Sequence, residues 1–160
     1  MTQIADTWMS YARSKYGVHE VLGDTDNPYI VHCLAQAGLR GQHDETAWCG
    51  AFMSDIMITT YPNHVLPQNP AAARSWLNYG VPVYPWRNEP SDLNAPIPYG
   101  AILILSRPPD PTHGHVTFYI QSMGDEFLCY GGNQNNQVGF GFYAKDRLLG
   151  VQWPEGIPLP

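Results

Sequence analysis

Hydrophobic periodicity divides the chain into a first half that predicts helices and a second half that predicts strands. Apolar residues recur every three or four positions in residues 4–16 and 49–60, which is the period of an amphipathic helix. After Gly100 they tend to recur at every second position, which is the period of a half-buried strand. Helices followed by strands indicate an α+β fold, with N-terminal helices packed on a small antiparallel sheet.

Capping residues and helix breakers set the predicted boundaries. Asn-Pro at residues 27–28 and again at 69–70 suits a helix start, because Asn caps the first turn and Pro fits its first position. Glycine or proline follows each helical segment and ends it. The predicted helices are residues 4–16, 28–37, 49–60 and 70–77, and the predicted strands are residues 101–105, 115–120, 126–130, 139–143 and 148–153.

Composition and charge narrow the class of protein. A length of 160 residues fits one domain covering residues 1–160, and no linker divides it. The net charge of −6, with no run of basic residues, argues against nucleic acid as a partner. No apolar run is long enough to span a bilayer, and the first residues lack the basic and apolar regions of a secretion signal. We therefore expect synthesis in the cytoplasm without membrane insertion.

Cys49 is the first candidate for chemistry. It falls in the first turn of a predicted helix, where free N–H groups and the helix dipole favour a thiolate. Asp44 and Thr46 are candidate N-cap residues just before it. The alternative is that Cys49 is a small buried hydrophobe. The other two cysteines, Cys33 and Cys129, do not make a disulfide framework, and the sequence leaves open whether they pair.

A base and an orienting residue are available in the predicted strands. His115 lies on the strand face opposite Val116, and the polar run of residues 131–136 follows the next strand. Thiol catalysis needs such a base and a third group that fixes its tautomer, and Cys–His–Asn is one known set. His113 competes as the base, but a strand residue is held more firmly than one in a proline-rich turn.

Purely structural roles and metal binding are alternatives to thiol catalysis for these residues. A strand histidine is more often structural than catalytic, and a Gly-Gly-Asn-Gln run is most often a plain turn. The cysteines and His113 and His115 are zinc-ligand types, but no Cys-x-x-Cys or helical His pair supports zinc. Residues 23–28 alternate acidic side chains like a calcium loop, yet lack its later glycine and glutamate. We expect no metal and no cofactor.

The motifs together resemble a known family. Residues 44–52, Asp-Glu-Thr-Ala-Trp-Cys-Gly-Ala-Phe, resemble the nucleophile motif of CHAP and NlpC/P60 cysteine peptidases, in particular a phage-associated subgroup. Residues 73–77, 114–119 and 131–134 are similar to further blocks of that subgroup in the same order. The resemblance covers roughly residues 5–154.

This resemblance implies a papain-like fold and hydrolysis of an amide bond in peptidoglycan, either muramoyl-L-alanine or a bond in the stem or cross-link peptide. Cys49 matches the nucleophile and His115 matches the base. Many CHAP domains place Glu-x-Asn at the end of the next strand, whereas this chain has Gly-Gly-Asn at residues 131–133. Asn133 is therefore carried over as the orienting residue, with Gln134 as the fallback.

Further expectations concern the substrate groove. Residues 81–99 are rich in proline and contain aromatic residues such as Trp86, and they predict an ordered surface loop of the kind that often edges a binding site. Trp48, next to the nucleophile, is expected to shape the groove. The residues expected to bind substrate are Trp48, Asp44, Gln134, Trp86 and His113.

Two biological settings suit a wall hydrolase with no signal peptide and no separate wall-binding domain. One is an endolysin released through a holin, and the other is an antibacterial amidase effector, such as a type VI secretion effector, which would pair with an immunity protein. Two further functional classes stay open. They are a non-catalytic module that grips glycans or peptides with aromatic residues, and a cysteine transferase or deamidase on the same fold.

Overall fold

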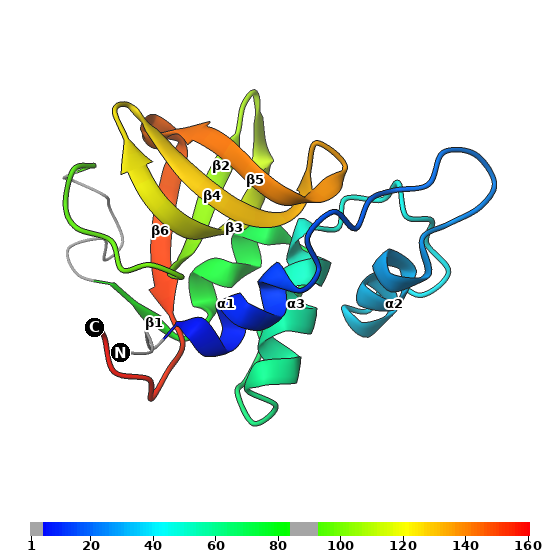
Figure 1. The fold of residues 1–160 in the computed structure, drawn as a ribbon, viewed down its shortest axis with the longest axis horizontal. Coiled ribbons are helices and arrows are strands. Elements are labelled where there is room, and N and C mark those ends of the chain that lie inside the picture. The colour runs from blue at the N-terminus through cyan, green and yellow to red at the C-terminus, as the bar shows by residue number, and fades with distance from the viewer. Residues whose placement is uncertain (1–4, 84–92) are drawn as a thin grey trace.

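The computed structural model describes residues 5–83 and 93–160, and within them it confirms the α+β fold (Figure 1). The predicted second helix keeps its Asn-Pro start, because the Asn27 side chain accepts the N–H of Tyr29. The third helix has the predicted bounds. The α-helices are α1 (Asp6–Arg13), α2 (Pro28–Gln36) and α3 (Cys49–Thr60), and the 3-10 helices are η1 (Ala73–Asn78) and η2 (Lys145–Arg147).

The second half of the chain forms a six-stranded antiparallel sheet in the order β1-β6-β2-β3-β4-β5. All five predicted strands are present, and most are longer than predicted. The strands are β1 (Val81–Pro82), β2 (Ile102–Arg107), β3 (Asp110–Met123), β4 (Glu126–Gln134), β5 (Gln137–Ala144) and β6 (Leu148–Trp153).

The run of glycine and amide residues after Tyr130 is not the plain turn that its composition suggests. β4 continues to Gln134, which pairs with Gln137 of β5. Only Asn135 and Asn136 form the turn, and both have positive φ, 54° and 60°. Two left-handed residues are what a two-residue hairpin requires, and asparagine tolerates that conformation.

The predicted helix at residues 70–77 is wrong in type and start. A 3-10 helix begins at Ala73 instead, and its N-cap is Ala72. Side chains take up the carbonyls before it, since Trp76 Nε1 donates to Pro70 O at 3.0 Å and Ser75 Oγ donates to Ala72 O at 2.8 Å. These bonds replace the α-helical ladder in that segment.

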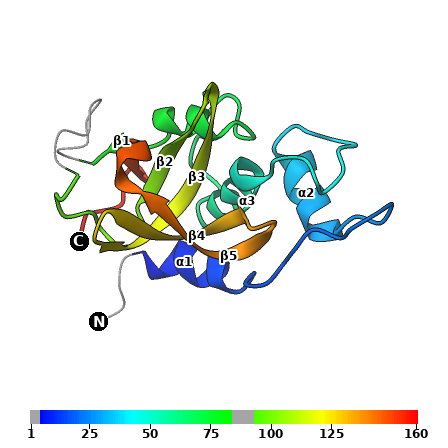
Figure 2. The same ribbon diagram turned by 90° about the horizontal axis from the view of Figure 1, so that it is seen from above.

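Helix α3 is the centre of the helical layer. Residues 49–57 are all buried, because α2 covers one side of the helix, the sheet covers another and α1 packs beside it (Figures 1 and 2). A buried carboxylate ties the three helices together: Asp55 Oδ2 accepts the hydroxyls of Tyr11 at 3.0 Å and Tyr29 at 2.6 Å. The middle of α3 is therefore tied to both neighbouring helices.

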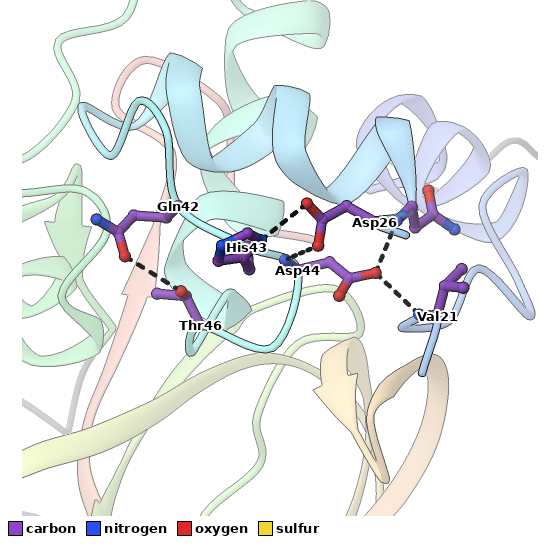
Figure 3. A network of polar contacts seen from close by, with 7 residues as sticks. Val21, Asp26, Gln42, His43, Asp44 and Thr46 are labelled. Atoms are coloured by element: carbon purple, nitrogen blue, oxygen red, sulfur yellow. Dashed lines mark hydrogen bonds and ion pairs between the residues drawn. The ribbon is translucent and has the colours of Figure 1, made fainter. Parts of the chain in front are cut away.

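The predicted N-caps of α3 are wrong. Trp48 is the N-cap residue and makes no side-chain capping bond. Asp44 instead accepts the backbone N–H groups of Val21 at 2.8 Å and Asn27 at 2.7 Å, while its own N–H donates to Asp26 (Figure 3). Asp44 therefore pins the loop before α2 to the loop before α3. Thr46 donates to Gln42, away from the helix.

Close packing of β4 on α3 requires glycine at position 132. A Cβ there would lie 2.6 Å from the Cβ of Phe52 and 2.8 Å from the ring of Trp48. We predict that Gly132→Ala lowers the free energy of unfolding by about 1–3 kcal/mol in urea denaturation, because overpacked cores must shift. Gly139→Ala in the neighbouring strand is the control, since its Cβ would meet nothing closer than 3.7 Å. Equal losses in the two variants would contradict this account of the packing.

Candidate active site

Cys49 lies at the first position of α3, where the helix meets the sheet. Its side chain is 7% exposed, and it receives backbone hydrogen bonds from Val116 and from Gly50. Gly50 is required beside it, because a Cβ would lie 2.5 Å from Pro70 O and 2.7 Å from Ala71 O. The segment before η1 therefore packs directly against the first turn of the helix, behind the thiol.

His115 is the partner of this thiol. It lies on β3, is 8% exposed, and forms a side-chain hydrogen bond with Cys49. Its Nε2 lies 3.1 Å from Oε1 of Gln134. The sheet thus brings together residues from the helical half of the chain, from β3 and from the end of β4.

The orientation of the Gln134 amide is determined by its surroundings. Gln134 is 2% exposed, and its Nε2 donates to Gly139 O at 2.6 Å and to Cys129 O at 3.5 Å. Because carbonyl oxygens only accept, the Oε1 atom must point the other way, where it accepts the Thr117 hydroxyl at 2.6 Å.

This fixed amide sets the tautomer of His115. An acceptor oxygen 3.1 Å from Nε2 calls for a proton on that nitrogen. Nδ1 then remains to exchange a proton with the Cys49 thiol. Cys49, His115 and Gln134 therefore stand in the order that thiol catalysis requires of a nucleophile, a base and an orienting group.

Asn133 does not hold this position, which corrects the residue carried over from the resemblance. The β4–β5 register shifts between Gly131 and Gln134, and Asn133 has a positive φ of 55°. This irregularity turns the Asn133 side chain to the pocket wall and aims that of Gln134 at His115.

The surroundings of Cys49 favour its charged form. Burial alone would raise the pKa of the thiol, but the hydrogen bond and charge of His115 oppose this effect, together with the N–H groups of Val116 and Gly50. The net result is a pKa below the ordinary value of a cysteine. Burial has the opposite outcome at the other two cysteines, since it raises the pKa of Cys33 to about 12 and also raises that of Cys129. All three cysteines are free, so Cys33 and Cys129 do not pair.

Cys49 and His115 open onto a cavity of about 420 Å³. Three residues of its wall were missing from the sequence-based site, namely Arg107, Tyr143 and Arg147. The Tyr143 ring lies 4.9 Å from the ring of His115. Strand alternation could have indicated Tyr143, which pairs with Phe127 on β4, but nothing in the sequence brings the two arginines together. The cavity is lined by Cys49, Arg107, His115, Asn133, Asn135, Asn136, Tyr143 and Arg147.

Most of the residues expected to bind substrate lie elsewhere. Asp44 and Trp48 are completely buried, so neither can contact a substrate in this conformation. Asp44 accepts backbone N–H groups, and Trp48 Nε1 donates to Glu20. Gln134 faces His115 instead of the cavity. His113 is exposed, contacts Asp110, and lines an adjoining hollow that shares Arg107 with the Cys49 cavity. Trp86 lies outside the described residues.

Metal clusters and membrane-spanning helices are both absent from the part of the chain that the structure describes. Within residues 5–83 and 93–160, no three His, Cys, Asp or Glu side chains gather closely enough to hold a metal ion. No helix in the same part of the chain is long and apolar enough to cross a membrane.

Comparison with solved structures places the fold among known proteins. No protein-family model matches the chain, and no curated protein sequence matches it. The crystal structure of the wild-type endolysin LysIME-EF1 superposes on 96% of this chain with a TM-score of 0.57 and 14% identity. This chain shares the fold of that protein. It spans 65% of the length of that protein. The crystal structure of Ly7917 has a TM-score of 0.41 at 13% identity, over 94% of this chain and 62% of that one.

The lowered pKa of Cys49 predicts selective alkylation. We expect iodoacetamide to modify Cys49 near neutral pH and to spare Cys33 and Cys129, with a rate that rises through a midpoint below the value of about 8.5 typical of a free thiol. His115→Ala should move this midpoint to higher pH, because burial then raises the pKa of the thiol without the opposing effect of the His115 side chain. Mass spectrometry of the modified peptides across pH gives the measurement.

His113→Ala is the matched control for this titration, since it removes the neighbouring exposed histidine. We expect its midpoint to equal that of the wild type. A midpoint that moves with His113 and not with His115 would contradict the assigned pair.

Proposed function

We propose that the protein is a cysteine hydrolase that cleaves an amide bond of peptidoglycan. The observation that carries the proposal is the hydrogen-bonded series Cys49–His115–Gln134 at the wall of an open cavity. The fold shared with an endolysin supports the cell wall as the target, and the resemblance of the sequence to CHAP and NlpC/P60 peptidases supports the cysteine class.

The proposed reaction is acyl transfer through a thioester. The Cys49 thiolate attacks the amide carbonyl, and free N–H groups in the first turn of α3 stabilise the oxyanion, each contributing about 3 kcal/mol. Collapse of the intermediate breaks the C–N bond, and His115 gives its Nδ1 proton to the leaving amine. A water molecule then gives a proton to His115 as its oxygen attacks the thioester, and breakage of the C–S bond releases the acid and restores the Cys49 thiolate beside protonated His115.

Catalysis is favoured over a non-catalytic binding module because a glycan- or peptide-binding surface has no use for an activated thiol. Of the aromatic residues on which such a module would depend, Tyr84 and Trp86 lie outside the described residues, and Tyr99 is half-buried and accepts a hydrogen bond from Arg13. Hydrolysis is favoured over transfer or deamidation because the polar, open cavity gives water access to the thioester. In this proposal the protein acts in the wall or periplasm, after holin release or injection, and an immunity protein would have to cover this cavity.

Cys49→Ala should abolish the release of peptides or amino sugars from purified peptidoglycan while the far-ultraviolet circular dichroism stays unchanged. Cys33→Ala is the control, because it removes a buried thiol behind α3, away from the cavity, and should keep the activity. Mass spectrometry of the fragments identifies the bond that is cleaved and separates hydrolysis from transfer. Full activity in Cys49→Ala would exclude the proposed nucleophile.

Gln134 and Asn133 are expected to differ in their contribution to the rate. Gln134→Ala should lower kcat by about 10²-fold with little change in KM, because His115 then loses the acceptor that fixes its tautomer. Asn133→Gly, which keeps the positive φ of that position, should leave kcat within about threefold. A larger loss of kcat at Asn133 than at Gln134 would restore the assignment carried over from the family.

A further inference from the structure

The charge of the cavity is opposite to that of the protein. The chain has a net charge of −6, yet the described residues that line the Cys49 cavity include two arginines and no carboxylate. The rest of the wall consists of amides, a tyrosine, His115 and Cys49, and the charge of the Cys49 thiolate is balanced by His115. A locally positive, partly enclosed wall raises the local concentration of anions.

Arg147 is held in place as part of this wall. It ends η2, and its Nε and Nη2 donate to Ser106 O at 2.9 and 2.7 Å. Its guanidinium carbon lies 5.3 Å from the centre of the Tyr143 ring, which is the ring next to His115. An arginine has five N–H donors, so three remain without a partner among the described residues.

Arg107 completes the pair from another element. It is the last residue of β2, is exposed, and lines both the Cys49 cavity and the adjoining hollow. Neither arginine forms an ion pair with a carboxylate in the described part of the chain. Burial raises the pKa of Tyr143, and the charges of both Arg147 and Arg107 oppose that rise.

We propose that Arg107 and Arg147 form a carboxylate-binding subsite beside Cys49. The planar guanidinium matches a carboxylate through paired N–H donors, and Arg147 is already ordered by Ser106 and Tyr143. The inference rests on the proposed function for its substrate: a stem peptide with a free carboxylate next to the scissile amide, in preference to one in which that group is amidated.

The competing explanation is that the two arginines only stabilise the thiolate of Cys49. Iodoacetate and iodoacetamide separate the two explanations, because they carry the same leaving group and differ only in a carboxylate against a carboxamide. An effect on the thiolate changes both alkylation rates together, whereas a carboxylate subsite changes their ratio. The ratio of rates at Cys49, measured by mass spectrometry, is therefore the quantity that tests the subsite.

We expect the iodoacetate-to-iodoacetamide ratio to fall about threefold in Arg107→Gln and in Arg147→Gln, and about tenfold in the double variant. Arg40→Gln removes an exposed arginine that does not line the cavity, and it should keep the wild-type ratio. If Arg147→Gln unfolds because it loses the contact with Ser106, Arg107→Gln alone decides the outcome. Arg107 is exposed at a strand end, so its replacement should leave the fold intact. Equal ratios in the wild type and Arg107→Gln would overturn the inference.

The failure of this inference can be told apart from the failure of the proposed function. Alkylation requires no hydrolysis, so the ratio reports on the subsite even if the protein releases nothing from peptidoglycan. With a substrate that is cleaved, a matched pair of stem peptides, acid and amide, should differ about tenfold in kcat/KM in favour of the acid. Equal kcat/KM values in the presence of hydrolysis would overturn the subsite and leave the hydrolase intact.

Discussion

The arrangement of the site depends on one side-chain amide. Gln134 is bound on one side by two carbonyls and on the other by a hydroxyl, so its oxygen faces His115 and no other orientation satisfies all of its partners. The amide is buried, and a reversed orientation would leave several polar groups unpaired at a cost of about 1–3 kcal/mol each. The tautomer of His115 follows from this constraint, and in the proposed reaction that tautomer leaves Nδ1 to exchange a proton with Cys49.

The glycines around Gln134 make room for this amide. A Cβ at Gly131 would lie 2.7 Å from the Thr117 hydroxyl and 3.1 Å from Gln134 Oε1. A Cβ at Gly141 would lie 3.1 Å from Gln134 Nε2. The glycine-rich ends of β4 and β5 are thus a packing requirement of the site, in the same way that Gly132 is a packing requirement of the contact between β4 and α3.

The sequence was sufficient for the features that depend on local periodicity. Helix α3 and the faces of β3 follow from apolar spacing alone, and they place Cys49 at a helix start and His115 opposite Val116. The third residue could not be predicted in this way, because an irregularity in β4 decides whether residue 133 or residue 134 faces the histidine. Asp44 was misassigned because its partners, the N–H groups of Val21 and Asn27, come from a loop that only the fold brings near.

The two arginines of the cavity also could not be predicted from the sequence. Arg107 ends β2 and Arg147 ends η2, and the antiparallel pairing of β2 with β6, next to η2, brings the two ends together. Sheet order is a long-range property, so neither charge pattern nor spacing in the sequence indicates the pair. The overall acidity of the chain even suggests the opposite sign for its cavity.

The proposed reaction requires that Cys49 be a thiolate maintained by His115, and the ultraviolet absorbance of the thiolate measures this directly. The difference in absorbance between the wild type and Cys49→Ala, followed across pH, isolates this one group from the two buried cysteines. A midpoint well below the value of about 8.5 for a free thiol, shifted upward when Gln134 is replaced by alanine, is the predicted result. A midpoint at or above the free-thiol value would contradict the account.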